Sequence, residues 1–258
     1  MNESTLRYKT LSDFTRIIAL FEEPAVEERG VSDIAKSLQM LPSKVSRMLK
    51  TLEADDWVEK SPHTGKYRIG VRFLQAGLLY VSNHTLRRLI LPHVEQMARE
   101  MGLLSGWGIF KNGKVIIVDR IRIKNGPLVH LLGSDVPLHS SSYGKLFLAY
   151  LTGQELDGML QSMMFNILTP KTISTADALK NELTRVREMG YAVDEEETRE
   201  GIIGFAAPVF DDSNNLVAAI TISGPTNEFS HDRVLEVSYL REKGLFISRQ
   251  LGNRTEGP

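Results

Sequence analysis

One short segment of the sequence, PLHSSSYGKLFLAY over residues 137–150, combines a histidine, three serines and a lysine. Ser142 and Lys145 have the Ser-x-x-Lys spacing in which penicillin-binding enzymes place a nucleophile and its base. The same spacing arises by chance in helices, because residues three apart share one helical face. The segment is therefore a candidate active site, a wall of a binding pocket or the capped start of a helix.

A serine hydrolase or amidase that uses Ser142 and Lys145 would need further elements. Ser-x-x-Lys enzymes also carry a Ser-Asp-Asn element and a Lys-Thr-Gly strand, and the nearest fragments, GSDV and PKTI, each lack a required residue. The sequence has no Gly-x-Ser-x-Gly elbow either. We therefore expect no enzyme and keep the hydrolase as the alternative hypothesis. Ser140 and Ser141 fit better as helix caps, and His139 fits better as a hydrogen-bonded structural residue.

The composition is that of a soluble globular protein, with 42% hydrophobic and 24% charged residues in 258. A net charge of −1 excludes a general polyanion binder but leaves room for a local basic patch. The absence of cysteine excludes disulfides and thiolate chemistry. We find no signal-peptide pattern and no apolar run near the roughly 20 residues that span a bilayer. We expect a cytoplasmic protein with no membrane partner.

No cofactor and no metal site are expected from the sequence. The acidic run Glu195–Glu197 has no histidine or cysteine pattern beside it, and is a weak signal for a metal. We interpret this run as a solvated or loop-stabilising segment.

Two short helices joined by a tight turn are predicted near the N-terminus, over GVSDIAKSLQM and LPSKVSRMLKTLEADDW. Ile34, Leu38 and Val45 fall where these helices must pack on each other. Such a pair is typical of a helix-turn-helix. Gln39 occupies the turn position, which is most often glycine and often adopts a left-handed backbone.

The outward face of the second helix carries short hydroxyls and long cations, which can contact bases and phosphates in a major groove. DDWVEKSPHTGKYRIG then predicts two short strands around a turn, the form of a wing. Residues 36–72 hold eight Lys or Arg against four Asp or Glu, a basic balance that favours phosphate contacts. The alternative is a pair of amphipathic helices with a solvated basic face. The predicted DNA-binding residues are Ser43, Lys44, Ser46, Arg47, Lys50, Lys66 and Arg68.

The rest of the chain alternates helical and strand patterns. A linker helix that also suits a dimer surface is followed by a second helix, which Pro92 starts or kinks. Asn112-Gly113 predicts a hairpin turn between two β-rich runs, and a further strand is predicted over residues 127–132. Strands over YAVDEE, IIGFAAPVF and LVAAITIS follow a helix that ends at Gly190, and a last amphipathic helix closes the chain. These elements predict a mixed sheet with flanking helices.

In these motifs the chain resembles the IclR family of bacterial transcriptional regulators over nearly its whole length. PLHSSSYGKLFLAYL is similar to the family's Pro-Leu-His-x-x-x-x-Gly-Lys segment. MGYAVDEEETREGIIGFAAPVFDDSNNLVAAITISGP is similar to its pattern of Gly-Tyr-x-x-Asp-x-Glu-Glu, Ala-x-Pro-Val-Phe-Asp and Ser-Gly-Pro. The resemblance implies a mixed α/β fold in three parts. These are a winged helix-turn-helix DNA-binding domain (1–70), a linker helix (71–84), and a GAF-like effector-binding domain (85–258) with a mostly antiparallel sheet flanked by helices.

The resemblance also implies a pocket for a small metabolite, between the Gly-Lys segment, the acidic segment and the last two strands. Carried over residue by residue, the effector-binding candidates are Ser142, Tyr143, Asp194, Gly204, Thr221 and Ser223. A helix N-terminus at Ser142 would favour an anion, and residues two apart on a strand, such as Thr221 and Ser223, share a face. As alternatives, Asp194 orders its loop, and Thr221 and Ser223 are ordinary strand residues.

Two departures from the family indicate a reshaped pocket. Gly204 stands where many relatives have cysteine, and Tyr143 replaces a small residue. We predict a small carboxylate or hydroxylated acid as effector, with an apolar part stacked on Tyr143.

Together these implications predict a ligand-responsive transcriptional regulator, a repressor or an activator, of a catabolic pathway. A single recognition helix reads a short half-site, so we expect a homodimer or homotetramer on a near-palindromic double-stranded DNA operator. A stand-alone metabolite-binding protein would not explain the basic helix-turn-helix.

Overall fold

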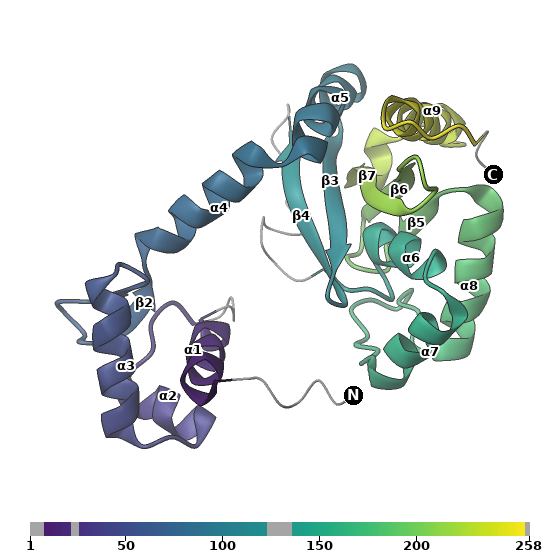
Figure 1. The fold of residues 1–258 in the computed structure, drawn as a ribbon. Helices are drawn as coiled ribbons and strands as arrows, with labels where there is room; N and C mark the ends of the chain where they lie inside the picture. Colours follow the sequence, from purple (N-terminus) through teal and green to yellow (C-terminus); the bar gives the residue numbers. More distant parts are fainter. Residues whose placement is uncertain (1–7, 22–25, 123–135, 256–258) are drawn as a thin grey trace. The chain divides into compact units, whose positions relative to one another are not determined.

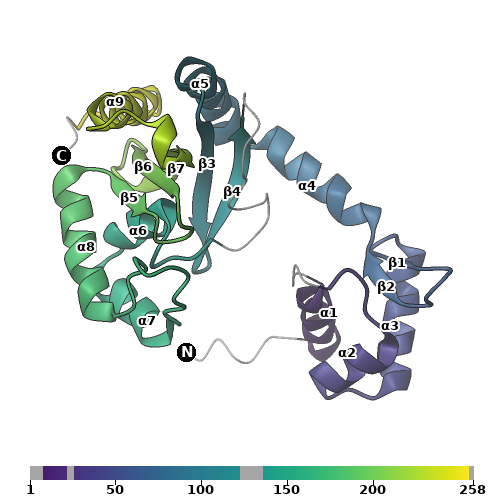
Figure 2. The ribbon, with the colours of Figure 1, turned by 180° about the vertical axis from the view of Figure 1, so that it is seen from behind.

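The structure is a computed structural model that describes residues 8–21, 26–122 and 136–255. It contains two compact units, Met1–His84 and Thr85–Pro258, and Figures 1 and 2 show each of them from two sides. The strand predicted over 127–132 lies outside the described residues. The division of the first unit into a DNA-binding domain and a linker helix stays a prediction.

The first unit is a winged helix-turn-helix followed by one more helix. Ile17, Ile34, Val45 and Leu49 are fully buried at its centre, so three amphipathic helices share one small core (Figure 1). Its elements are α1 (Lys9–Leu20), α2 (Val31–Leu38), α3 (Pro42–Ala54), the antiparallel pair β1 (Val58–Lys60) and β2 (Tyr67–Ile69), and α4 (Val71–Asn83).

The turn between α2 and α3 sets the angle at which these helices meet. Gln39 ends α2 in the left-handed region, with φ 54° and ψ 43°, which confirms the backbone expected at this position. The N–H of Met40 donates to the carbonyl of Ala35 at 2.9 Å and closes the turn. Ala35 is only 5% exposed, so a small side chain is needed where the helices approach.

The second unit is a five-stranded sheet with helices on both faces. In the described residues the strand order is β4-β3-β7-β6-β5, and every neighbouring pair is antiparallel. This confirms the mostly antiparallel sheet flanked by helices that the family resemblance implies, and corrects the mixed sheet expected from the strand pattern alone. The elements are α5 (Thr85–Met101), β3 (Leu104–Lys111), β4 (Lys114–Ile121), α6 (Ser142–Ala149), α7 (Gly153–Ser162), α8 (Ala176–Met189), β5 (Ala192–Glu195), β6 (Ile202–Phe210), β7 (Leu216–Pro225), the short 3-10 helix η2 (Thr226–Glu228) and α9 (Val234–Gln250).

The two faces of this sheet differ in chemistry because side chains alternate along each strand. On β7, Ile220 and Ile222 pack with the core under α5 and α9. Thr221 and Ser223 take the other face, which α6, α7 and α8 cover (Figures 1 and 2). Small and polar residues therefore collect beneath α6.

One helix start differs from the sequence-based expectation, and one helix was not expected. Pro92 lies inside α5 without ending it, and the break between α4 and α5 falls at His84, whose backbone is extended. α7 was not predicted, although Thr152 and Glu155 form a capping box at its start. Across the described residues, no helix has the length and apolar character needed to cross a membrane.

Candidate functional site

The predicted DNA-binding side chains lie on the surface of the first unit. Val45, Leu49 and Leu52 form the buried face of α3, so the remaining positions of that helix point outward. Ser43, Arg47 and Lys50 are exposed, and so are Lys66 and Arg68 in the wing formed by β1 and β2; Lys44 and Ser46 are half-buried.

Two of these cations also hold the unit together. The ammonium of Lys44 on α3 pairs with the buried carboxylate of Asp13 on α1, and its hydrogen bond lowers the pKa of Asp13. In the wing, Arg68 donates from Nε and Nη2 to Glu59 Oε2 at 3.1 and 2.9 Å, across a register pair of β1 and β2. Arg47 and Lys50 are therefore the exposed cations among the predicted DNA-binding residues of α3.

All six predicted effector residues line one small cavity in the second unit. The cavity measures about 30 Å³, which suffices for a water molecule or two. Its walls come from α6, β4, β5, β6 and β7. They consist of Arg120, Ser141, Ser142, Tyr143, Asp194, Ile202, Ile203, Gly204, Thr221 and Ser223.

The first turn of α6 forms one wall of this cavity. Ser141 is the N-cap residue, as expected: its Oγ accepts the Gly144 N–H at 3.0 Å and its own hydroxyl donates to the Pro137 carbonyl at 2.5 Å. A Cβ at Gly144 would lie 2.4 Å from the Cα of Leu138, so only glycine fits there. Ser142 and Tyr143 follow the cap, and N–H groups at such positions have no acceptor within the helix.

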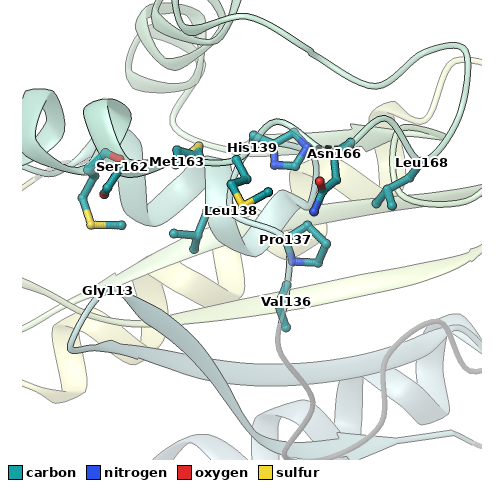
Figure 3. A pocket seen from close by; sticks show the side chains of 11 residues that line it. Gly113, Val136, Pro137, Leu138, His139, Ser162, Met163, Asn166 and Leu168 are labelled. Carbon is teal, nitrogen blue, oxygen red and sulfur yellow. Dashed lines mark hydrogen bonds between the residues drawn. The ribbon is translucent and has the colours of Figure 1, made fainter. Parts of the chain in front are cut away.

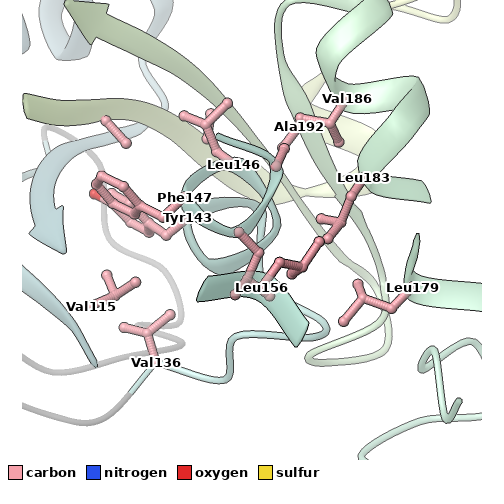
Figure 4. Packing of buried hydrophobic residues seen from close by; sticks show 14 of the residues in the cluster. Val115, Val136, Tyr143, Leu146, Phe147, Leu156, Leu179, Leu183, Val186 and Ala192 are labelled. Atoms are coloured by element: carbon pink, nitrogen blue, oxygen red, sulfur yellow. The ribbon is translucent and has the colours of Figure 1, made fainter. Parts of the chain in front are cut away.

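Tyr143 fills much of the space beneath α6. A Cβ at Gly106 would lie 2.9 Å from its hydroxyl oxygen, and one at Gly108 would lie 3.2 Å from its ring. These two glycines of β3 therefore make room for the ring, which is 4% exposed and lies with Phe147 in the buried cluster of Figure 4. Thr221 donates its hydroxyl to the phenol oxygen at 2.8 Å. Burial raises the pKa of Tyr143 to about 12, so the phenol stays neutral.

Strand register explains how residues distant in sequence meet at the cavity. Asp194, Gly204 and Ser223 are successive partners across β5, β6 and β7. Thr221 and Arg120 are both partners of Gly106, one from each neighbouring strand. The residues that line the cavity thus come from two neighbouring sets of cross-strand partners.

Arg120 is the charged residue that the sequence analysis missed. Arg120 lines the cavity, and burial lowers the pKa of its guanidinium. Counting outward from the Asn112-Gly113 turn would place Asp119 opposite Gly106. A β-bulge at Trp107 and Gly108 shifts the register by one residue and puts Arg120 there instead. The sequence predicted the hairpin, but no residue pattern in it predicted the bulge.

Asp194 lines the cavity and also orders the loop that follows β5. Its Oδ1 accepts the N–H groups of Glu197 and Thr198 at 2.9 and 3.1 Å, and its Oδ2 accepts the Thr198 hydroxyl at 2.5 Å. Burial raises the pKa of Asp194. The loop-ordering role considered for this residue is therefore present in the structure.

Comparison with known proteins identifies the group to which this architecture belongs. A family model described as "Bacterial transcriptional regulator IclR C-terminal" matches residues 78–249. The chain belongs to the IclR family. A second model, the MarR family, matches residues 16–69, a range that extends from α1 to the end of the wing.

Two curated relatives of this IclR-family chain are transcriptional regulators. HTH-type transcriptional regulator XynR of Escherichia coli (strain K12) is 28% identical over 92% of this chain and 94% of its own length. HTH-type transcriptional repressor AllR of Salmonella typhi is 33% identical over 86% of this chain and 83% of its own length. Like them, the chain is a DNA-binding transcriptional regulator.

Solved structures of the family share the fold. The crystal structure of Thermotoga maritima IclR is 28% identical, covers 94% of this chain and 98% of that chain, and has a TM-score of 0.69. An IclR homolog from Microbacterium hydrocarbonoxydans, complexed with 4-hydroxybenzoate, has a TM-score of 0.76 at 20% identity and covers 94% of this chain and 99% of that chain.

In this regulator Lys145 has a structural partner rather than a catalytic one. Its ammonium is 1% exposed, pairs with Glu197, and lies 3.6 Å from Glu182 Oε1. The base that a hydrolase would need beside Ser142 is therefore engaged by carboxylates from α8 and from the loop after β5. No group of three or more metal-binding side chains occurs among residues 8–21, 26–122 and 136–255.

Glu197 is the carboxyl group of this buried cluster whose ionised form is unfavourable. Burial raises its pKa to about 7, against the opposing effect of Lys145, and Asp194 adds a like charge. Its Oε2 is buried without a hydrogen-bond partner in the structure. The single positive charge of Lys145 thus lies near several carboxylates, and protonation of Glu197 lowers the excess of negative charge.

We predict that replacement of Glu197 by Gln removes a pH dependence of stability. The pKa of Glu197 in the folded chain, about 7, exceeds the roughly 4.3 of an exposed glutamate. The stabilisation from its proton is therefore complete below about pH 4.3 and disappears as the pH rises through about 7. The free energy of unfolding of the parent chain, relative to Glu197→Gln, should fall between pH 5.5 and 8.

Urea unfolding followed by Trp107 fluorescence in a Trp57→Phe background measures this difference in the second unit. Glu196→Gln is the control, because the hydrogen bond from Lys171 lowers the pKa of Glu196 and its effect should be level over this range. A difference that grows with pH for Glu197→Gln would show that the ion pair with Lys145 dominates instead.

Proposed function

We propose that this regulator senses a compact organic acid in the cavity beneath α6 and thereby changes its affinity for a near-palindromic DNA operator. The observation that supports the acid is that Arg120 and the N-terminus of α6 line the same cavity. Both favour a negative charge, the first as a cation and the second through its N–H groups and dipole.

The remaining walls suit the polar groups of a hydroxylated acid. Ser142, Thr221 and Ser223 offer hydroxyls, and Asp194 offers a carboxylate that can accept a hydrogen bond from a ligand hydroxyl. A carboxylate with a hydroxyl is also what the Microbacterium regulator of the same fold holds. We propose a catabolic acid of this general class as the effector.

Effector entry requires Tyr143 to move. A space of about 30 Å³ does not hold an organic acid, and the ring is fixed by Gly106, Gly108 and the Thr221 hydrogen bond. A ligand that takes the place of the ring therefore binds an opened arrangement of α6 and the sheet better than the closed one. Such differential binding is what couples a ligand to a conformational change. No catalytic role is proposed for Ser142.

DNA recognition in this proposal uses α3 and the wing of two protomers. One recognition helix reads one half-site, so a near-palindromic operator calls for a homodimer, or for a homotetramer of two dimers. Because its partner is chromosomal DNA, we propose that the protein acts in the cytoplasm.

The dimer contact that we propose is the apolar stripe of α4. No residue of α4 is buried, yet Val71, Leu74 and Leu78 are 46%, 60% and 60% exposed at helical spacing. A second copy of the same helix would cover this stripe in an isologous contact.

We predict that Arg47→Ala weakens operator binding. Loss of a bidentate base contact costs about 1–3 kcal/mol, which is roughly 5-fold to 150-fold in affinity. Fluorescence anisotropy on a genomic fragment selected by the parent protein measures the change. Lys111→Ala, an exposed cation of the second unit, should leave the affinity unaltered. Unchanged binding by Arg47→Ala would remove α3 as the reading helix.

We predict that Ser223→Ala spares DNA binding and blunts the response to the effector, because the residue lines the cavity and lies far along the chain from α3. Calorimetry with a panel of organic acids identifies the ligand, and operator release is then compared between the parent and the variant. Binding of cationic or purely apolar compounds alone would contradict the acid assignment.

We predict that Leu74→Glu combined with Leu78→Glu separates protomers, because four like charges would meet in the proposed contact. Light scattering after size exclusion should give about half the mass of the parent assembly. Ala76→Glu with Asn83→Glu adds the same charge to exposed positions of α4 that face away from this stripe and should preserve the assembly. An unchanged mass for the leucine pair would place the dimer contact elsewhere.

A further inference from the structure

A second, larger cavity lies on the same unit and shares no lining residue with the effector cavity. It measures about 420 Å³ and opens between the β3–β4 turn at Gly113, the segment before α6, and the end of α7 (Figure 3). His139 and Asn166 lie together on one side of it, and Ser162 and Met163 lie on the other. This volume is within the usual range for small-molecule sites.

The lining of this cavity carries no full charge in the described part of the chain. It contains no Asp, Glu, Lys or Arg, whereas the effector cavity holds both Arg120 and Asp194. A charged ligand would lose its hydration here without gaining an opposite charge. The two cavities therefore favour ligands of different chemistry.

Three methionines contribute to the apolar part of the wall. Met159, Met163 and Met164 come from the end of α7 and the residues just after it, and Met164 is 76% exposed at the rim. Thioether side chains are flexible and polarizable, and they contact aromatic rings favourably. They adapt to a flat ring better than branched aliphatic residues do.

On the other side of the cavity, His139 is held in place by a hydrogen bond and by a ring contact. His139 is 4% exposed, its Nε2 lies 3.0 Å from the Asn166 carbonyl oxygen, and its ring meets Phe165 edge-on at 5.5 Å. The amide of Asn166 supplies a polar group beside the apolar lining. A neutral hydrogen-bonding group on the ligand can pair with it.

We propose that this cavity binds an uncharged aromatic metabolite, at a site distinct from the proposed effector site. The bound ring contacts Met159 and Met163, and a neutral N–H or O–H group of the ligand bonds at the Asn166 side. The occupant also touches the backbone before α6, because Pro137 and Leu138 line the cavity and Pro137 accepts the cap hydroxyl of Ser141.

Indole, an uncharged bicyclic probe, tests the proposal on the full-length protein labelled with methyl-13C methionine. The methyl resonances of Met159 and Met163, assigned through Met→Leu variants, should shift saturably on titration. Indole-2-carboxylate has the same ring with a charge and should bind at least tenfold more weakly. Absence of shifts at both residues, or equal binding of the two compounds, would overturn the proposal.

Matched variants locate the probe. Met163→Asp, or Met164→Asp at the exposed rim, should weaken indole binding at least tenfold. Gln161→Asp adds the same charge on α7 outside the lining and should not. Tyr143→Phe, in the effector cavity, should leave the indole shifts intact. Shifts lost in Tyr143→Phe, or retained at full affinity in both methionine variants, would show that indole binds elsewhere.

Discussion

The buried ammonium of Lys145 is the interaction on which the second unit depends. It joins α6 to Glu182 of α8 and to Glu197 in the loop after β5, and a charge so completely removed from water is stable only when it is paired. The hydroxyls of Thr169 and Thr172 donate to backbone carbonyls of the same loop. These contacts fix the loop after β5, and with it the cavity wall at Asp194.

The shape of the cavity depends on small residues on β3 that face a large residue on α6. Gly106 and Gly108 have no side chain, and the ring of Tyr143 fills the space that side chains at these positions would occupy. Gly204 gives up further volume beside Ser142 and Ser223, where a Cβ would find contacts at 3.4 Å. The ring of Tyr143 thus occupies most of the space beneath α6, and its hydroxyl accepts a hydrogen bond from Thr221. A family fold can change its ligand through such exchanges while its strand order stays the same.

Much of this arrangement could be predicted from the sequence, and the failures have physical reasons. The Asn112-Gly113 turn adopts positive φ at both residues, as its composition indicates, and Gly190 ends α8 with φ 73°. Period-two alternation correctly placed Thr221 and Ser223 together. The pairing of β3 with β7 could not be predicted, because it joins residues more than a hundred positions apart. The burial of Lys145 could not be predicted from the sequence either, because it depends on carboxylates from two distant segments.

The bulge in the β3–β4 hairpin has an evolutionary consequence. With the same residues and an unbroken register, Asp119 would replace Arg120 opposite Gly106, and the wall of the cavity would be acidic. The sign of the charge that a ligand meets is therefore encoded in the spacing of the backbone as well as in residue identity. A relative that gained, lost or moved this bulge would therefore carry a different charge in the cavity wall with hardly any change in amino-acid composition.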